Sequence, residues 1–243
     1  MKFNCIQIIA LLTLATATFF TSCEKAENKG GGTLKGSCKV SAVTGYFTSP
    51  LSIHYDDTGR IDTMITTGML RTYRYEDGGN KVSIFTRKAN ILEEQIVLKY
   101  NKDSKLLDTA QITFKNGTRE TRTYAYQNKN TITEYIYSPP DVDTITYNWS
   151  GGNMTEAHSS RGINPMTGIK YHTNMAFQEG DFNYINTLIE RGYVPVGKTA
   201  NLVQCNYSGN ISYKFNGNGY IRQVSSVHEG YPTINYTYEY TCK

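Results

Sequence analysis

The chain has 243 residues, of which 39% are hydrophobic and 19% are charged, and its formal net charge is +4. Its 20 Tyr and 9 Phe are spread along the whole length, which excludes a disordered chain, because disorder requires low hydrophobicity and high net charge. The small net charge, with no basic run among stacked aromatics, gives no indication of nucleic-acid binding. The longest apolar run, residues 6–20, is shorter than the ~20 residues of a spanning helix, which excludes a multi-span helical membrane protein.

Residues 1–22 predict a secretion signal. Lys2 gives a short basic region, an apolar run follows, and Thr21 and Ser22 place small residues directly before Cys23. This junction resembles a bacterial lipobox, which implies that Cys23 is diacylated and becomes the mature N-terminus; an ordinary signal peptide with an incidental cysteine is the alternative. Because more than one acyl chain anchors a protein stably, we expect a lipid-anchored outer-membrane protein that faces the periplasm or the cell surface.

Residues 23–33 predict a flexible tether, because they are polar and rich in glycine. The acidic residues after Cys23 resemble the export tags of Bacteroidetes surface lipoproteins, and a plain spacer is the alternative. From residue 34 to residue 243 no linker interrupts the pattern described next. We therefore expect a single domain over residues 34–243.

Alternation with period two dominates this region, for example over residues 71–75, 123–126, 133–137 and 234–240. Tyr, Thr and Ile in this pattern predict half-buried antiparallel strands. Asn, Asp and Gly clusters separate the strands and predict hairpin turns at residues 56–59, 76–80, 116–117, 151–153 and 216–219. The fold class is therefore all-β, a large antiparallel meander of roughly fifteen strands curled into a barrel or half-barrel, because a flat sheet of that size is improbable.

One segment, residues 181–191, has helical periodicity. Asp181 is a suitable N-cap, Gly192 ends the pattern, and the apolar residues fall on one face. That face comprises Phe182, Ile185, Leu188 and Ile189. We expect one short amphipathic helix that presses on the sheet or closes one end of it; a buried plug is the favoured interpretation and a ligand-gating lid the alternative.

A hairpin unit recurs along the chain, in which an aromatic residue is followed six residues later, across a turn, by an aliphatic one. Tyr55 and Ile61, Tyr100 and Leu106, and Phe215 and Ile221 are examples. The unit resembles the YD repeat of Rhs-type cell-surface proteins. Together with the lipobox it resembles a Bacteroidetes family of secreted lipoproteins of unknown function, described as having a porin-like fold. The resemblance implies no catalytic residues, because that family has none established.

Catalytic and metal-binding patterns are not found in the sequence. The four His lack ligand spacing, and no nucleophile motif, P-loop or Rossmann glycine pattern occurs. We therefore expect a protein that is not an enzyme and that uses no metal and no cofactor.

The cysteines suggest a disulfide. With Cys5 removed and Cys23 acylated, Cys38, Cys205 and Cys242 remain in an oxidising compartment. If the sheet closes with an even number of strands, its first and last strands are antiparallel neighbours, which places Cys38 opposite Cys242 for a disulfide.

Three threonines lie in Asp-Thr-aliphatic triplets, which resemble the O-glycosylation sequon of Bacteroidetes secreted proteins. They are Thr63, Thr109 and Thr144. Strand composition alone could also generate these triplets.

Tyrosine-rich strands favour a non-enzymatic lipoprotein whose sheet is a scaffold or binding module for a glycan, a peptide or an envelope partner. The residues expected to contact a ligand are exposed members of the tyrosine ladders, namely Tyr73, Tyr75, Tyr124 and Tyr126. The alternative is a carrier that holds a lipid or another apolar ligand inside a partly closed barrel. A hydrolase with its site in the loops ranks last, because no constellation of residues supports it.

Overall fold

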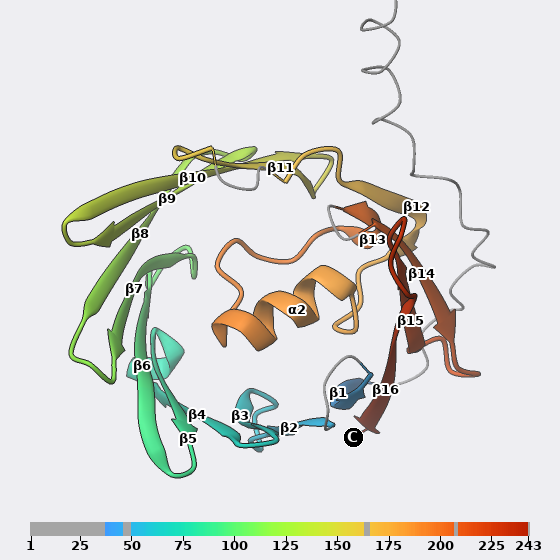
Figure 1. Ribbon diagram of the computed structural model, residues 1–243, viewed down its shortest axis with the longest axis horizontal. Helices are drawn as coiled ribbons and strands as arrows, with labels where there is room; N and C mark the ends of the chain where they lie inside the picture. The colour runs from blue at the N-terminus through green and yellow to red at the C-terminus, as the bar shows by residue number, and fades with distance from the viewer. Residues whose placement is uncertain (1–36, 46–49, 163–165, 207–208, 243) are drawn as a thin grey trace, which may run out of the picture.

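The computed structural model describes residues 37–45, 50–162, 166–206 and 209–242. They form one antiparallel sheet of 16 strands that curls into a nearly closed barrel around a helix (Figure 1). Consecutive strands are neighbours except for β11 and β12, which form the two edges of the sheet, and β1 also pairs with β16. The all-β meander predicted from the alternating pattern is thus confirmed.

The elements have the following bounds. The first half of the sheet comprises β1 (Cys38–Thr44), β2 (Leu51–Tyr55), β3 (Ile61–Thr66), β4 (Met69–Glu76), β5 (Lys81–Lys88), β6 (Ile91–Tyr100), β7 (Leu107–Phe114) and β8 (Arg119–Asn128). The second half comprises β9 (Thr131–Ser138), β10 (Asp141–Ser150), β11 (Asn153–Ser159), β12 (Lys170–Ala176), β13 (Asn201–Asn206), β14 (Gly209–Phe215), β15 (Ile221–Val227) and β16 (Ile234–Cys242). A single 3-10 turn, η1 (Asp77–Gly79), joins β4 to β5, and the helix α2 (Phe182–Arg191) lies between β12 and β13.

The predicted hairpin turns are all present, and side chains stabilise several of them. Asp56 Oδ1 accepts hydrogen bonds from the backbone N–H groups of Thr58 and Arg60, both at 2.9 Å. Asn216 Oδ1 accepts in the same way from Asn218 and Tyr220, both at 3.0 Å. Such short polar side chains offer the backbone the hydrogen bonds that a tight turn would otherwise leave unmade.

The start and the end of the described chain meet in the sheet, where β1 pairs with β16. Cys38 lies opposite Cys242, and a disulfide joins them with a Cα–Cα distance of 4.0 Å. With an even number of strands, the first and last strands are antiparallel neighbours, and Cys38 and Cys242 form the expected disulfide. The open seam of the barrel lies elsewhere, between β11 and β12.

Short polar contacts bridge this seam. Ala157 of β11 and Met166 exchange two backbone hydrogen bonds, at 2.8 and 2.9 Å. The side chain of Asn153 donates to Asn201 Oδ1 at 3.0 Å and accepts from the Asn201 N–H at 3.0 Å. The barrel is therefore closed at this point by loops and amide side chains, in place of a regular strand ladder.

Apolar and tyrosine side chains fill the interior of the barrel. In β7, Ala110 and Ile112 are buried, while Thr109 and Gln111 alternate with them and so point to the outer face. The same alternation buries Ile96 and Leu98 in β6. The interior consequently holds clusters of buried apolar side chains around the helix, which lies inside the barrel (Figure 1).

The ends of α2 are fixed from three directions. At its start, Asp181 accepts from the Tyr184 N–H at 3.1 Å and from the Val203 N–H of β13 at 2.9 Å. At its end, Gly192 adopts the left-handed conformation, φ 78°, and the buried Arg71 of β4 donates to the Ile189 carbonyl at 2.9 Å. The predicted bounds and caps of the helix are confirmed.

The buried face of α2 packs against the β1–β3 and β13–β16 side of the barrel. Phe182, Ile185 and Leu188 are buried, Ile189 is half-buried, and the Phe182 ring contacts Tyr236 edge-on at 5.6 Å. Among the described residues, no helix is long and apolar enough to cross a membrane.

Candidate functional site

The first candidate site is a cavity of about 220 Å³ between α2 and the inner face of β10 and β11, beside the seam; we call it the seam cavity. The strands contribute the large side chains Tyr147, Trp149 and Met154. The opposite wall is the polar face of α2, together with the segment 194–199 that returns from the helix toward β13. That face of α2 comprises Asn183, Asn186, Thr187 and Glu190.

A second cavity of about 260 Å³ lies between α2 and the strands β3–β6; we call it the tyrosine cavity. Its floor is apolar, with the buried Val82, Ile84 and Leu98. Five tyrosines contribute to its walls, namely Tyr73, Tyr75, Tyr100, Tyr184 and Tyr193. Residues shared with the seam cavity are Tyr184, Val194, Gly197 and Lys198. A thin partition made by α2 and the segment after it therefore separates the two cavities.

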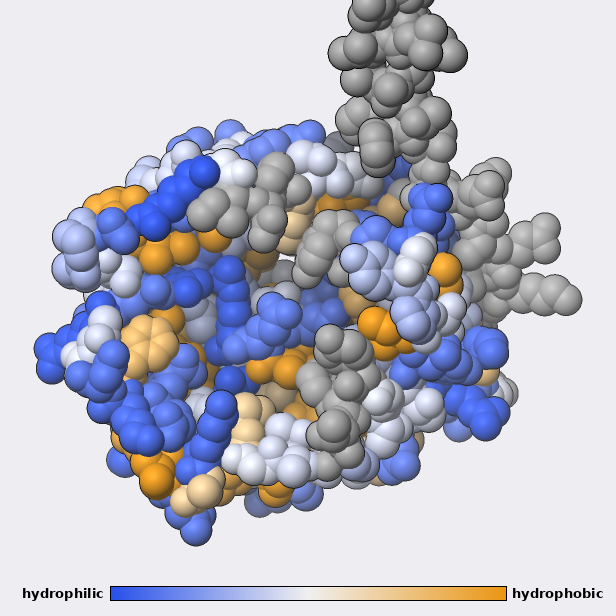
Figure 2. Space-filling model, viewed as in Figure 1, coloured by the Kyte–Doolittle hydropathy of each residue, from blue (hydrophilic) through white to orange (hydrophobic). Residues whose placement is uncertain are grey.

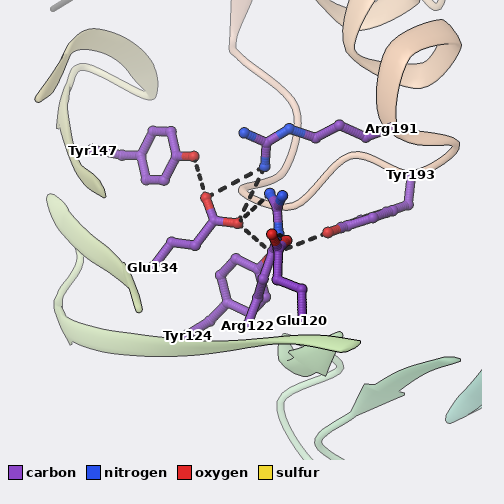
Figure 3. A network of polar contacts seen from close by, with 7 residues as sticks. All are labelled: Glu120, Arg122, Tyr124, Glu134, Tyr147, Arg191 and Tyr193. Atoms are coloured by element: carbon purple, nitrogen blue, oxygen red, sulfur yellow. Dashed lines mark hydrogen bonds and ion pairs between the residues drawn. The ribbon is translucent and has the colours of Figure 1, made fainter. Parts of the chain in front are cut away.

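Beside the seam cavity, a buried carboxylate joins α2 to the barrel wall (Figure 3). Glu134 of β9 is 0% exposed and pairs with Arg122 of β8 at 3.0 Å and with Arg191, the last residue of α2, at 3.2 Å. The hydroxyls of Tyr124 and Tyr147 donate to it at 2.9 and 2.5 Å. Glu120 accepts from Arg122, and Tyr193 contacts the Tyr124 hydroxyl at 3.4 Å. We call these seven residues the Glu134 network.

The network keeps Glu134 ionised. Burial acts to raise the pKa of this carboxyl, but Arg191, Arg122 and the two tyrosine hydroxyls outweigh it and lower the pKa. Burial likewise acts to lower the pKa of Arg191, and Glu134 opposite reverses the effect and raises it. Two arginines and two glutamates thus neutralise one another inside the barrel, and their hydrogen bonds hold α2 in place as a plug.

Two donors at the seam cavity have no partner. The indole Nε1 of Trp149 and the amide Nδ2 of Asn183 are buried from solvent, and neither atom has a hydrogen-bond partner among the described residues. The Asn183 Oδ1, in contrast, accepts from Asn206. An unpaired buried donor costs about 1–3 kcal/mol. Both side chains contribute to the wall of the cavity, but these two donor atoms are buried within that wall.

The four tyrosines predicted to be exposed ligand contacts all point into the barrel, so their expected exposure is wrong. Tyr73 and Tyr75 line the tyrosine cavity. Tyr124 is buried in the Glu134 network, and Tyr126 is half-buried with its hydroxyl donating to the Leu107 carbonyl at 3.1 Å. Their strands alternate in phase with the apolar core, so the tyrosines take the inner face. Their contact with a ligand stays a prediction.

The three predicted glycosylation sites lie on the outer wall. Thr63, Thr109 and Thr144 are half-buried, and each directly precedes a residue that faces the interior. Those residues are Met64, Ala110 and Ile145. Cys23, the predicted lipidation site, lies outside the described residues, as do the predicted signal and tether.

Apart from Tyr124, the residues of the Glu134 network are not predicted from the sequence as a site, and neither is Trp149. The sequence does contain one indication, because residues two apart in a strand point to the same face. Glu134 lies two residues after Ile132 and two before Ile136, so it occupies an inward position in β9. Arg122 precedes Tyr124 in the same way in β8. A charged residue in phase with a buried face predicts a buried partner, but not which one.

A metal site is not formed by the described residues: no group of three or more His, Cys, Asp or Glu side chains among them could hold an ion. The four His are distributed over β2, β11, β12 and the β15–β16 connection.

Comparison with known proteins gives structural similarities only. No protein-family model matches the chain, and no curated protein matches it. A porin-like protein from Bacteroides vulgatus is similar over 83% of this chain and 98% of its own, at 14% identity and a TM-score of 0.48. A porin-like protein from Bacteroides uniformis is similar over 84% of this chain and 96% of its own, at 12% identity and a TM-score of 0.36.

Proposed function

We propose that this chain is a non-enzymatic binding protein, anchored to an outer membrane through acyl groups on Cys23, that holds a small, partly apolar molecule inside its barrel. The observation that carries the proposal is the pair of cavities on either side of α2, about 220 and 260 Å³ in volume, with aromatic walls. An apolar cavity of roughly 150 Å³ already holds benzene, so each cavity accommodates a single ring or a short acyl chain.

The architecture supports this carrier function. Interior cavities among convergent polar groups are the usual form of small-molecule sites, and the barrel supplies both. The interior charges of the Glu134 network and of Arg71 already contact the end of α2 and hold the helix in place. Figure 2 shows hydrophilic side chains gathered in the hollow of the barrel mouth and hydrophobic patches around it.

The test uses Trp149, because the chain has 1 Trp and it lines the seam cavity. We expect 1-octanol to change the tryptophan fluorescence saturably. Ala157→Leu fills the cavity from β11 and should weaken this binding by about tenfold or more. His158→Leu, on the exposed side of the same strand, is the matched control and should leave it unchanged.

A second measurement uses protein from its native host. Mass spectrometry of an organic extract should identify a co-purifying small molecule that is lost from Ala157→Leu. Equal binding of 1-octanol by the two variants, or no fluorescence response at all in folded protein, would reject the carrier function.

Exposed apolar side chains favour a second function, a binding module for a glycan, a peptide or an envelope partner. All large hydrophobic residues that are exposed among the described residues, except Leu106, lie at the end of the barrel that carries the β5–β6 and β7–β8 hairpins. They are Ile65, Ile91, Leu92, Phe114, Tyr137, Val142, Val227 and Tyr231. Apolar side chains exposed at one end of a protein are candidates for an interaction site.

Glycan-array binding tests this second function. Signal from the unaltered chain that Tyr231→Ser reduces would support it, since Tyr231 is 69% exposed and its ring lies 5.2 Å from that of His228. A blank array would count against glycan recognition at this rim.

A further inference from the structure

The five tyrosines that line the tyrosine cavity differ in how their hydroxyls are used. Three hydroxyls are hydrogen-bonded within the protein, namely those of Tyr73, Tyr75 and Tyr193, whose partners are the Gly192 carbonyl, the Ile61 carbonyl and the Tyr124 hydroxyl. The hydroxyls of the other two, Tyr100 and Tyr184, have no hydrogen-bond partner among the described residues, and neither oxygen is buried from solvent. Two polar groups on the wall of this cavity are therefore open to a ligand.

Tyr100 also differs from the tyrosines that hold equivalent positions in neighbouring strands. Near the C-terminal ends of β2, β4 and β8, an inward tyrosine donates to a carbonyl of the preceding strand. These tyrosines are Tyr55, Tyr75 and Tyr126, and their acceptors are the carbonyls of Val40, Ile61 and Leu107, at 2.8, 2.8 and 3.1 Å. Tyr100 ends β6 and packs on the same apolar cluster as Tyr75 and Tyr126, but its hydroxyl bonds to none of the described residues. This hydroxyl does not hold strands together, which leaves it available to a ligand.

Tyr184 faces the cavity from the opposite wall, in the first turn of α2. The Nζ of Lys198 lies 5.4 Å from the centroid of its ring. Burial raises the pKa of Tyr184, and Glu179, Tyr75 and Tyr100 raise it further, so these groups are close enough to act on one another electrostatically. Burial also raises the pKa of Tyr100. Both hydroxyls consequently stay protonated at neutral pH and can donate hydrogen bonds.

The walls of the tyrosine cavity offer little to a charged ligand. Among the described residues that line it, Lys198 is the only charged one, and Glu179 is its ion-pair partner at 3.4 Å. A cation would find no carboxylate on these walls and an anion would find no unpaired cation, and burying an ion without a partner is strongly unfavourable. The floor, with Val82, Ile84 and Leu98, is apolar. The cavity therefore suits an uncharged molecule with an apolar body.

We infer that the tyrosine cavity binds an uncharged ring compound whose acceptor oxygen takes hydrogen bonds from Tyr100 and Tyr184. The inference rests on the proposed carrier function and names the substrate class of this cavity. Aromatic walls favour a planar ring, and a volume of about 260 Å³ exceeds the roughly 150 Å³ that holds benzene, which leaves room for a polar substituent. The oxygen of a ketone, an aldehyde or an ester accepts from a hydroxyl without carrying a charge.

The experiment compares four single-ring probes by calorimetry, namely acetophenone, ethylbenzene, benzoate and benzylammonium. Acetophenone and ethylbenzene share one carbon skeleton, and ethylbenzene is the more apolar, so a cavity without available donors would prefer ethylbenzene. We expect acetophenone to bind about tenfold more tightly than ethylbenzene, because it gains two hydrogen bonds. Both ions should bind more weakly than acetophenone, because the walls offer no free counter-charge.

Phenylalanine substitutions identify the donors. Tyr100→Phe and Tyr184→Phe should each reduce the preference for acetophenone by about threefold, and the double variant should abolish it without weakening ethylbenzene binding. Neither change should alter the melting temperature of the ligand-free protein. Tyr126→Phe is the matched control, because it removes the bond to the Leu107 carbonyl and should lower the melting temperature but keep the preference. Ala157→Leu fills the seam cavity and should leave acetophenone binding unchanged.

Several outcomes would overturn the inference and leave the carrier function in place. They are equal or reversed affinities for acetophenone and ethylbenzene, tighter binding of either ion, and a preference that persists in the double variant. Loss of acetophenone binding in Ala157→Leu would place the ligand in the seam cavity and overturn the inference as well. If no ring probe binds but 1-octanol still changes the fluorescence of Trp149, only the inference fails; if 1-octanol gives no response either, the carrier function fails with it.

Discussion

Glu134 of β9 and Arg191 at the end of α2 form an ion pair, 3.2 Å between oxygen and nitrogen, that fastens the interior helix to the barrel wall. On the opposite side, Arg71 of β4 donates to the carbonyls of Leu188 and Ile189 at 3.3 and 2.9 Å. The last turn of α2 is thus held between two strands that are far apart in the sheet order. A helix fixed in this way forms a permanent wall for the two cavities beside it.

Glu134→Gln should therefore destabilise the fold. It leaves the half-buried Arg191 without its carboxylate and Arg122 with Glu120 alone. Breaking a buried ion pair costs about 3–5 kcal/mol in the free energy of unfolding. Chemical denaturation at neutral pH measures this. The control is Glu93→Gln, whose partner Lys115 is exposed and whose loss should cost less than about 1 kcal/mol.

The acid dependence of stability follows from the same carboxylate. The pKa of Glu134 is lowered in the folded state, so its contribution is fully present above the pKa of the unfolded chain and is lost as pH falls through the folded pKa. Unfolding curves of the unaltered chain should therefore lose stability in acid more steeply than those of Glu134→Gln. Parallel curves for the two proteins would contradict this assignment.

Gly192→Ala should loosen the end of α2. Gly192 has φ 78°, and an added Cβ would lie 2.9 Å from Cδ of Arg71, so both strain and contact oppose a side chain there. We expect a loss of more than about 1 kcal/mol in the free energy of unfolding. Gly217→Ala is the control, because nothing lies within 4 Å of its added Cβ. Similar melting temperatures for both variants would argue against this role of Gly192.

The disulfide between Cys38 and Cys242 should stabilise the chain strongly, because the two cysteines are 204 residues apart in the sequence. Cross-links that close long loops restrict the unfolded chain most, and removal of a native disulfide typically costs about 2–5 kcal/mol. Replacing both cysteines with serine and measuring thermal unfolding tests the size of the effect. Peptide mapping without reduction should recover the two cysteines in one linked peptide, and a different linkage would contradict the structure.

The seam should be the first part of the barrel to open. Asn153→Ala removes both hydrogen bonds to Asn201 that connect β11 to the start of β13. Hydrogen exchange should become faster in β11 and β12 and remain unchanged in β4 and β5, which are paired on both sides. Gln111→Ala, at an exposed position of β7 away from the seam, should not change exchange there. Uniform acceleration over all strands would mean that the barrel opens as one unit.

Local sequence patterns predict the helix and the hairpins of this fold. The bounds of α2 follow from Asp181, Gly192 and the apolar residues between them, because caps and periodicity act within a few residues of sequence. Turn chemistry at Asp56 and Asn216 likewise acts locally and predicts the hairpins. Counting these hairpins predicts roughly fifteen strands, and the described residues form 16.

The Glu134 network depends on contacts between residues that are far apart in the sequence, which no local pattern predicts. Tyr124 and Arg191 are 67 positions apart in the chain and meet around Glu134 only because β8 and β9 curve around the helix. The alternating pattern does not predict the inward direction of Tyr73 and Tyr75 either, since alternation defines two faces but not which one becomes the inside.

The amino-acid sequence alone predicts a meander of hairpins, one capped helix and the pairing of cysteines in the first and last strands, because turns, caps and strand parity are properties of neighbouring residues or of counting. Only the tertiary structure decided that the sheet closes around the helix, that its seam lies between β11 and β12, and that Lys198, Trp149 and Asn183 line the same cavity. The physical reason is curvature: the direction in which a twisted sheet bends decides which face becomes the interior, and that direction depends on the packing of all strands together.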